Sequence, residues 1–462
     1  MGKRKNPNFS RTNQDEFQPE TTFNRTDNMI KFRTAISYSN EMNQHESRKS
    51  SHPENPNRLI SIYRHLCNEG LLEKCYLLTD VRSATLTEIQ LIHSFYGALG
   101  SDWENFWYIV IVIINFPASV KREGFLLKRD NYFFFNFTIK SIKLDHIKNI
   151  EKSADSNEKN LDKMEKYYES IYLNQFTYSC AKVAIGHLLN LVDAVMTDKV
   201  RNGMAFIRPP GHHSCSNSAS GFCIFNNVAI ASQYAIHAHN LSRILIVDWD
   251  IHHGDGTQEI FYENPKVLYI SIHRYDNAKF FPYKTSSNYD YVGKCRGKGF
   301  NINMPFNGTP MGDTEYMMTF LKIIMPVSYQ FNPQLVLVSS GFDAAIGDPL
   351  GNYNVSPECY GHMTYSLSSL ACGRVILVLE GGYNLQTIAT CSENCVKSLL
   401  GHLPPPLNLQ FPIKFSAQKT IFKVMESQEL YWNCLKQFKP KNKEKEDIIN
   451  MFQDLKIVKN DI

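Results

Sequence analysis

The feature that most constrains the fold is a set of short β-rich runs, separated by longer segments of helical character. The runs span residues 204–208, 243–249, 267–273, 335–339 and 374–379. Four of these five are apolar almost throughout, which is typical of strands that are covered on both faces. Strands of this kind that alternate with helices form a parallel sheet with helices on each side. The sequence therefore predicts an α/β protein.

The remaining segments differ in character. Residues 58–96 and 181–196 have the apolar spacing of helices. Residues 1–33 are polar and rich in asparagine, so we expect a disordered N-terminal tail. Residues 102–140 are crowded with aromatic side chains and have no clear period. This segment is either a real insertion, such as a hairpin or a partner-binding excursion, or an intron translated in error, and both interpretations stay open.

Composition argues against several classes of protein. The chain has 49 Lys and Arg against 45 Asp and Glu, a formal net charge of only +4, which disfavours a dedicated nucleic-acid binder. No apolar run reaches the roughly 18 residues of a membrane span, and we expect neither a secretion signal nor a lipid anchor at the N-terminus.

The 11 scattered cysteines indicate free thiols in a reducing compartment. The short basic run at residues 3–5 is a weak nuclear address and is more typical of a solvated tail.

Polar, glycine-rich motifs follow four of the predicted strands directly. The motifs are PPGHH at 209–213, DIHHGDG at 250–256, GFD at 341–343 and EGGY at 380–383. In open parallel α/β sheets, ligands bind at the carboxyl ends of the strands, and glycine lets the backbone approach a ligand closely. The sequence therefore predicts one site to which all four motifs contribute.

Asp250, His252 and Asp343 are the candidate metal ligands. Asp250 and His252 are two residues apart at a strand end, so their side chains point the same way, and Asp343 can complete the set from a neighbouring strand. Two carboxylates and one imidazole suit a borderline metal such as zinc. Three protein ligands leave a position open for water and substrate, as in catalytic sites. An Asp-rich turn alone would be read as a solvated loop, but the neighbouring motifs favour a metal site.

His212 and His213 form a candidate acid–base pair. Each needs a carboxylate to fix its tautomer, and Asp248 and Asp255 lie on the neighbouring loop. Tyr383 follows two glycines at a strand end, so its hydroxyl can face a developing oxyanion. A lone tyrosine is more often a core or surface residue, and this assignment depends on the other motifs.

These motifs, together with GFCIFNNVAIA, VLYISIHRYD, GDPLGNY and LEGGYNL, resemble the zinc-dependent histone deacetylase family of class II, and class IIb in particular. The resemblance extends over about residues 34–438 and skips 102–140, which leaves 439–462 as a charged C-terminal tail. It implies one catalytic domain with an arginase-like fold. Such a fold has a central eight-stranded parallel sheet that is flanked by helices.

The resemblance assigns zinc to the three ligands already derived, pairs His212 with Asp248 and His213 with Asp255, and makes Tyr383 the oxyanion donor. It further implies five substrate-binding residues. Phe222 and Phe281 flank a narrow tunnel for the acetyl-lysine stem, Gly221 offers its carbonyl, Arg58 lines an inner pocket for acetate, and Leu350 stands at the tunnel mouth.

Two structural potassium sites are also implied by the resemblance. The first uses Asp248, Asp250, His252, Ser271 and Ile272, and the second lies around Phe261, Asn264 and Val267. One position departs from the family pattern, because class II members usually have Asn where this chain has Asp255.

The predicted function is that of a hydrolase acting on linear amides, which cleaves N6-acetyl-lysine in acetylated histone tails or in other acetylated proteins such as tubulin. A corepressor complex is a possible partner, and the nucleus, the cytoplasm or both are the expected location. An acetylpolyamine amidohydrolase on the same fold is the alternative, although such relatives carry Glu where Leu350 stands. A two-manganese arginase-type hydrolase and a catalytically inactive scaffold are further rivals.

Overall fold

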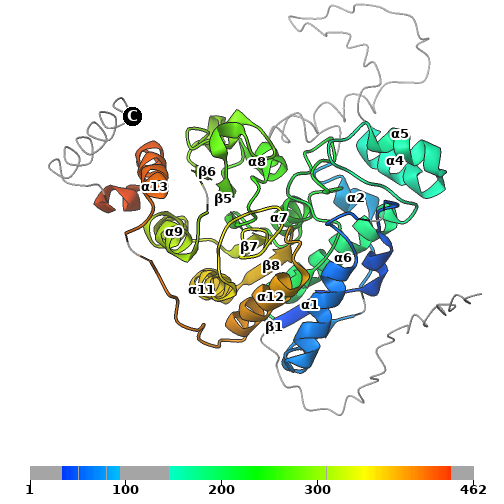
Figure 1. Cartoon of the computed structure of the whole chain (residues 1–462), viewed down its shortest axis with the longest axis horizontal. Helices are drawn as coiled ribbons and strands as arrows, with labels where there is room; N and C mark the ends of the chain where they lie inside the picture. The colour runs from blue at the N-terminus through cyan, green and yellow to red at the C-terminus, as the bar shows by residue number, and fades with distance from the viewer. Residues whose placement is uncertain are drawn as a thin grey trace, which may run out of the picture. The chain divides into compact units, whose positions relative to one another are not determined.

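Eight parallel strands form a sheet at the centre of the described part of the chain (Figure 1). Their order in the sheet is β2-β1-β3-β8-β7-β4-β5-β6. The strands are β1 (Thr34–Tyr38), β2 (Tyr76–Leu78), β3 (Asn202–Phe206), β4 (Ile244–Asp248), β5 (Val267–Arg274), β6 (Asn301–Phe306), β7 (Leu335–Ser340) and β8 (Val375–Leu379). The predicted eight-stranded parallel sheet is confirmed.

The computed structural model describes residues 34–49, 51–79, 81–93, 145–308, 310–410 and 412–438. All of these residues lie in one compact unit of the chain. The predicted N-terminal tail (1–33), the aromatic segment (102–140) and the C-terminal tail (439–462) lie outside the described residues. Each of the 11 cysteines is described, and all have free thiols.

The five predicted strands are present, whereas β1, β2 and β6 had no clear signal in the sequence. β2 has only three residues, and it lies within a stretch that was predicted to be mostly helical. β1 and β6 are buried, but they contain polar residues that break the apolar run. In β6, for example, the amides of Asn301 and Asn303 each donate a hydrogen bond of 2.8 Å to the side-chain oxygen of Gln258. Buried polar groups that find partners in this way are common.

Helices cover both faces of the sheet. In one layer α7 packs against α6 and α8, and in the other α12 packs against α1 and α11 (Figure 1); right-handed crossovers would put these two layers on opposite faces of the sheet. The described α-helices are α1 (Asn57–Asn68), α2 (Leu86–Ile89), α4 (Asp145–Lys152), α5 (Glu158–Glu165), α6 (Thr177–Met196), α7 (Asn227–Ala238), α8 (Asp255–Phe261), α9 (Asp313–Thr319), α10 (Met325–Phe331), α11 (Pro357–Leu367), α12 (Leu385–Leu399) and α13 (Phe415–Gln428).

The four strands that precede the polar motifs are neighbours at the middle of the sheet. They lie in the order β3-β8-β7-β4, although the chain visits them far apart in sequence. Because all of them are parallel, their carboxyl ends meet at one edge. The topology thus brings the four motifs together.

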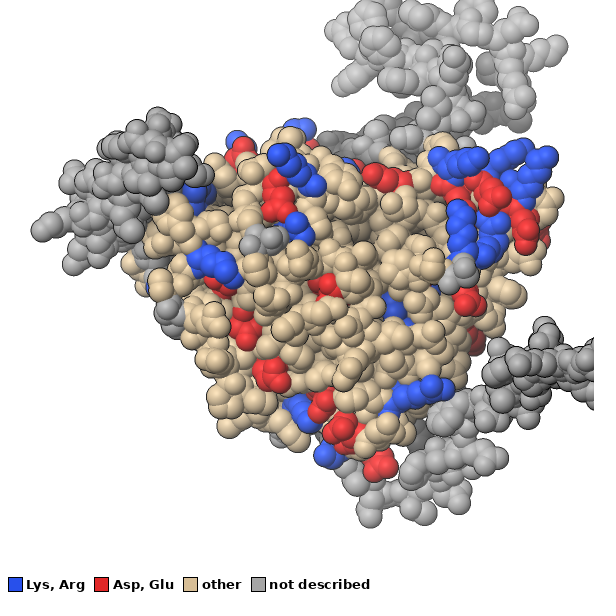
Figure 2. All heavy atoms as spheres, viewed as in Figure 1, with Lys and Arg blue, Asp and Glu red and all other residues tan. Residues whose placement is uncertain are grey.

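Charged side chains of both signs gather over α4 and α5, whereas the middle of the same face is mostly uncharged (Figure 2). Arg48 lies in this region and forms ion pairs with Asp162 at 2.7 Å and with Glu165 at 2.9 Å. These pairs attach the loop between β1 and α1 to α5. The same loop reaches the site described below.

Helix α6 packs against the part of the sheet that contains β1, β2, β3 and β8. Its length and its mean hydropathy of 1.3 would let it cross a membrane, but most of it is buried inside the protein, as in the core helix of a globular domain. Gly186 lies where α6 packs closely against the backbone of another segment, because a Cβ atom there would be 1.9 Å from the carbonyl oxygen of Arg82. The sequence predicted this helix over residues 181–196, and the structure confirms it with an earlier start.

We expect Gly186→Ala to lower the free energy of unfolding by about 1–3 kcal/mol, because the backbone of residues 82–84 must move. This cost exceeds the gain of about 1 kcal/mol in helix propensity. Gly361→Ala in α11 is the matched control, since the nearest heavy atom there would be 3.4 Å away. Thermal unfolding of the two variants should show a lower Tm for Gly186→Ala only. Equal Tm values would contradict the tight contact.

Candidate active site

Asp250, His252 and Asp343 lie together at the carboxyl ends of β4 and β7, which are adjacent strands. One ligand atom from each lies within 4.8 Å of the other two. The Nδ1 atom of His252 is 3.1 Å from Oδ1 of Asp250 and 3.0 Å from Oδ2 of Asp343. The structure thus brings the three predicted zinc ligands into one cluster.

Backbone groups and glycines hold the two carboxylates in place. The amide of Gly381 donates to Asp250 at 2.8 Å, and the amide of Ile251 donates to Asp343 at 2.8 Å. A Cβ atom on Gly341 would lie 2.0 Å from Oδ2 of Asp250, and one on Gly381 would lie 2.3 Å from Oδ2 of Asp343. Glycine is therefore required at both positions, as the motifs suggested.

The two carboxylates are wholly buried and face one another. Burial, together with the negative charge of Asp250 beside it, raises the pKa of Asp343. Two buried like charges this close are unfavourable unless a cation lies between them. The donor set of two carboxylates and one imidazole therefore fits a zinc ion.

A second group of potential ligands lies nearby but is less suited to a metal. It consists of His212, Cys223 and Glu380, all of them buried. The Nδ1 atom of His212 is already 3.0 Å from Asp248, and burial raises the pKa of the Cys223 thiol well above its usual range. Because only the thiolate is a good metal ligand, the first cluster is the better candidate.

The rings of His212 and His213 are adjacent, with their centroids 4.0 Å apart and their planes tilted by 51°. The Nδ1 atoms donate to carboxylates, His212 to Asp248 at 3.0 Å and His213 to Asp255 at 2.7 Å. Burial and the charge of His212 lower the pKa of His213 to about 4. For His212 burial also favours the neutral form, but Asp250 and Asp248 outweigh it and raise its pKa. His213 is thus suited to act as a base and His212 as a fixed charge.

Tyr383 lies on the loop after β8, where its backbone amide donates to Asp348 at 2.7 Å. The centroid of its ring lies 5.9 Å from that of Phe222, in an edge-on arrangement. The guanidinium of Arg58 lies 5.2 Å from the centroid of the Tyr383 ring. Burial, with the charge of Asp343, raises the pKa of the Tyr383 hydroxyl well above its usual range. The hydroxyl therefore keeps its proton and can donate it in a hydrogen bond.

The predicted tunnel residues surround His213. The ring of Phe281 meets that of His213 edge-on at 4.9 Å. Gly221 has a φ of 53°, and a Cβ atom there would lie 2.6 Å from the His213 ring and 2.9 Å from the Phe281 ring. Phe222 follows Gly221 and contacts Tyr383. Of the two predicted tunnel rings, Phe281 thus lies against His213 and Phe222 lies against Tyr383.

Leu350 lies on the loop that follows Asp343, and 38% of it is exposed. Asp348 shapes this loop, because its Oδ1 accepts hydrogen bonds from the amides of Leu350 at 2.8 Å and Gly351 at 3.0 Å. The other oxygen of Asp348 accepts from Tyr383. Leu350 is therefore an exposed apolar side chain on the loop that also anchors Tyr383.

Arg58 takes part in a wholly buried ion-pair network centred on Glu54. Glu54 accepts two hydrogen bonds of 2.7 Å from Arg208 and lies 3.2 Å from Arg58. Arg58 in turn donates to the carbonyls of Gly382 and Glu380, which precede Tyr383. Arg208 precedes the PPGHH motif, so the network joins the two loops that carry the catalytic residues.

Two supporting residues were missed in the sequence. Glu380 accepts hydrogen bonds from the amides of Gly211 at 2.7 Å and His212 at 3.2 Å, and its place just before GGY could have indicated it. Tyr269 on β5 donates to Asp248 at 2.9 Å. Tyr269 lies within the VLYISIHRYD motif, but no role was assigned to it, because its contact depends on the pairing of β4 with β5.

The residues of the predicted potassium sites lie in two places. Asp248 and Ser271 are register partners on β4 and β5, with Ile272 next in the strand. Asn264 and Val267 lie in the turn between α8 and β5, where the amide of Asn264 donates to the carbonyl of Phe261 at 2.9 Å. Both potassium sites stay a prediction.

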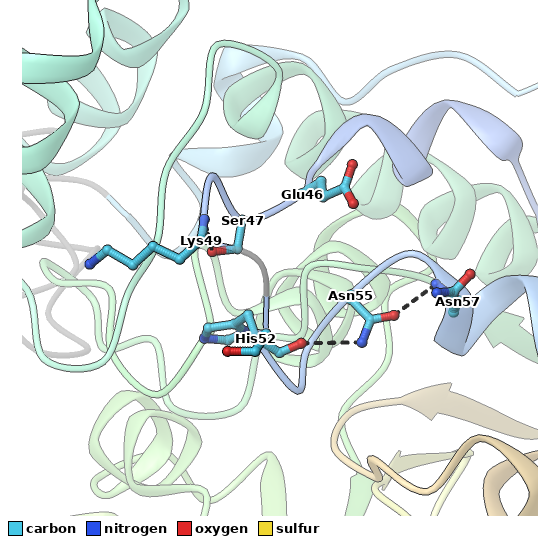
Figure 3. Close-up of a pocket in the computed structure, with 7 residues that line it drawn as sticks. Glu46, Ser47, Lys49, His52, Asn55 and Asn57 are labelled. Carbon is cyan, nitrogen blue, oxygen red and sulfur yellow. Dashed lines mark hydrogen bonds between the residues drawn. The ribbon is translucent and has the colours of Figure 1, made fainter. Parts of the chain in front are cut away.

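A polar pocket lies on the loop between β1 and α1 (Figure 3). Its volume is about 340 Å³, and its lining residues are Glu46, Ser47, Lys49, Ser51, His52, Asn55 and Asn57. Asn55 donates to the carbonyl of His52 at 3.2 Å and accepts from the amide of Asn57 at 3.0 Å (Figure 3). The His52 ring meets the Phe222 ring edge-on, with the ring centroids 4.6 Å apart, so the lining of this pocket contacts one of the predicted tunnel residues.

Comparison with known proteins gives consistent relatives. The chain is 41% identical over 402 residues to histone deacetylase 6 of Caenorhabditis elegans, covering 84% of this chain and 37% of that protein. It is 46% identical over 294 residues to the polyamine deacetylase HDAC10 of Mus musculus, covering 63% and 44% of the two chains. The chain thus spans less than half the length of these curated relatives. These relatives confirm the predicted likeness to class IIb.

Solved structures and the domain family agree with this result. The crystal structure of the HDA15 HD domain superposes with a TM-score of 0.70 at 30% identity, covering 87% of this chain and 97% of that one. This likeness confirms the predicted arginase-like fold. Residues 136–399, more than half of the 462, match the histone deacetylase domain. This chain therefore belongs to the histone deacetylase family.

Proposed function

We propose that this chain is a zinc-dependent protein deacetylase, which hydrolyses the amide of N6-acetyl-lysine to lysine and acetate. The observation that carries the proposal is the convergence of three parts on one edge of the sheet. These parts are the Asp250–His252–Asp343 cluster, a buried histidine that favours its neutral form (His213) and a protonated tyrosine hydroxyl (Tyr383). A metal cluster, a base and an oxyanion donor are the components of amide hydrolysis.

Zinc held by the cluster would supply a Lewis acid that polarises the acetyl carbonyl and acidifies a water molecule. His213 takes the proton of the attacking water on Nε2, because its Nδ1 is occupied by Asp255. It later gives that proton to the lysine amine as the amine leaves. Tyr383 donates a hydrogen bond to the oxyanion, and one such donor contributes about 3 kcal/mol to catalysis.

The loop at Leu350 favours a polypeptide substrate. Leu350 is exposed and uncharged, and the nearby carboxylate of Asp348 has each of its oxygens occupied by backbone amides. Leu350 carries no charge and Asp348 is buried, so neither residue presents an exposed carboxylate to a second ammonium group of a polyamine. An acetylpolyamine is the second candidate substrate, because the relatives include polyamine deacetylases at 46–47% identity.

The remaining assignments also belong to this proposal. The polypeptide would be a histone tail or another acetylated protein such as tubulin, met in the nucleus or the cytoplasm, and a corepressor complex is a candidate partner. The two potassium ions would be structural. A catalytically inactive scaffold would need a lost ligand or a lost Tyr383, and each of these residues is present.

The zinc ligands can be tested directly. We expect Asp343→Ala to lose bound zinc and deacetylation of a fluorogenic acetyl-lysine peptide, because it removes one of only three protein ligands. Zinc content by mass spectrometry and activity with and without a chelator are the measurements. Asp198→Ala is the control, since this exposed aspartate pairs with Arg374 away from the site. Full activity of a zinc-free Asp343→Ala protein would contradict the mechanism.

The role of Tyr383 predicts a large effect on turnover. We expect Tyr383→Phe to fold and bind zinc normally but to lose on the order of 100- to 1000-fold in kcat, the usual effect of one oxyanion donor. Steady-state kinetics on the same peptide will measure it. A loss below about threefold would show that Tyr383 is not the oxyanion donor.

Substrate choice is tested by Leu350→Glu. The wild-type chain should have a higher kcat/KM for an acetyl-lysine peptide than for N8-acetylspermidine. The new carboxylate should raise polyamine turnover and lower peptide turnover, because a charge at a partly desolvated site contributes up to a few kcal/mol. Leu350→Gln is the uncharged control. A wild-type preference for the polyamine would favour the second candidate instead.

A further inference from the structure

Asp255, the partner of His213, has a second partner. Its Oδ1 accepts from Nδ1 of His213 at 2.7 Å, and its Oδ2 lies 2.5 Å from Nζ of Lys284. The Asp255 side chain is only 4% exposed, whereas the Lys284 side chain is 46% exposed. Each oxygen of this buried carboxylate therefore has one partner, an imidazole on the inside and an ammonium group that reaches in from the surface.

Lys284 belongs to the loop that carries Phe281, one of the tunnel walls. Although burial disfavours the charged form of Lys284, the carboxylate of Asp255 raises its pKa. Likewise, burial opposes ionisation of Asp255, but the hydrogen bond from His213 and the charge of Lys284 hold its pKa below the usual range. Asp255 and Lys284 are therefore an ion pair at neutral pH.

The net charge of this pair is zero. A bare buried carboxylate beside His213 would attract a positive charge onto the ring. With Lys284 as counter-ion, Asp255 still accepts the hydrogen bond of His213, but the negative electrostatic potential at the His213 ring is much weaker.

We propose that Lys284 is a positioning residue for the deacetylation: it holds the carboxylate of Asp255 from the outer side and neutralises its charge, so that the inner oxygen of Asp255 orients the His213 ring. This role rests on the proposed function, because it acts through the general base. Lys284 itself contacts neither the zinc cluster nor Tyr383 in the described part of the chain.

The test is Lys284→Met, which keeps the length of the side chain and removes its charge. We expect kcat on the acetyl-lysine peptide to fall about tenfold, a part of what a general base contributes, with KM changed by less than about threefold. Zinc content and Tm should match those of the wild type. Lys284→Arg should restore kcat to within about threefold of the wild type, because it restores the charge.

Lys414→Met is the matched control. Lys414 is also 46% exposed and also lies beside a buried carboxylate, that of Glu315 at 3.7 Å, but away from the catalytic residues. We expect its kcat to equal that of the wild type. A loss of kcat in both lysine variants would show a general effect of removing such a pair and would overturn the specific role of Lys284.

A double mutant separates action through Asp255 from any other effect. In an Asp255→Asn background, Lys284→Met should change kcat by less than about twofold, since no carboxylate remains to be neutralised. A tenfold loss in that background, or an unchanged kcat for Lys284→Met alone, would overturn the inference. A zinc-loaded wild type inactive on both acetyl-lysine peptide and acetylpolyamine would instead contradict the proposed function and remove the basis of this inference.

Discussion

The site depends on one buried ion-pair network, in which Glu54 serves two arginines. Arg208 fixes the loop before the catalytic histidines, and Arg58 fixes the carbonyls before Tyr383. Removing one partner of a buried ion pair typically costs about 3–5 kcal/mol, because the other charges stay buried. The two loops therefore keep their positions together. This rigidity lets residues from β3 and β8 act on one small volume at the edge of the sheet.

The predicted metal cluster, in contrast, contains an unfavourable interaction. Asp250 and Asp343 are like charges that are held close by backbone amides and by glycines that leave no room for a side chain. Such an arrangement is unfavourable in isolation and becomes favourable when a cation binds. Proteins often hold unfavourable groups at functional sites and stabilise them through the rest of the fold. Here the fully buried central strands provide that stability.

The sequence was sufficient for the central strands and for the metal cluster, because apolar runs and adjacent polar motifs are local signals. β1 and β6 were missed, since buried polar residues such as Asn301 and Asn303 interrupt their apolar pattern. Contacts such as Glu54 with Arg208 and Asp255 with Lys284 were also missed. They join residues 154 and 29 positions apart, and only the path of the loops brings them together. The roles of the individual site residues stay predictions.

Asp348 has a kinetic consequence. Its two oxygens accept hydrogen bonds from the amides of Leu350, on the exposed loop, and of Tyr383, inside the candidate site, so one side chain supports both segments. A ligand that displaces the rim loop also displaces the support of the oxyanion donor. Discrimination between substrates is then expressed in turnover as well as in binding.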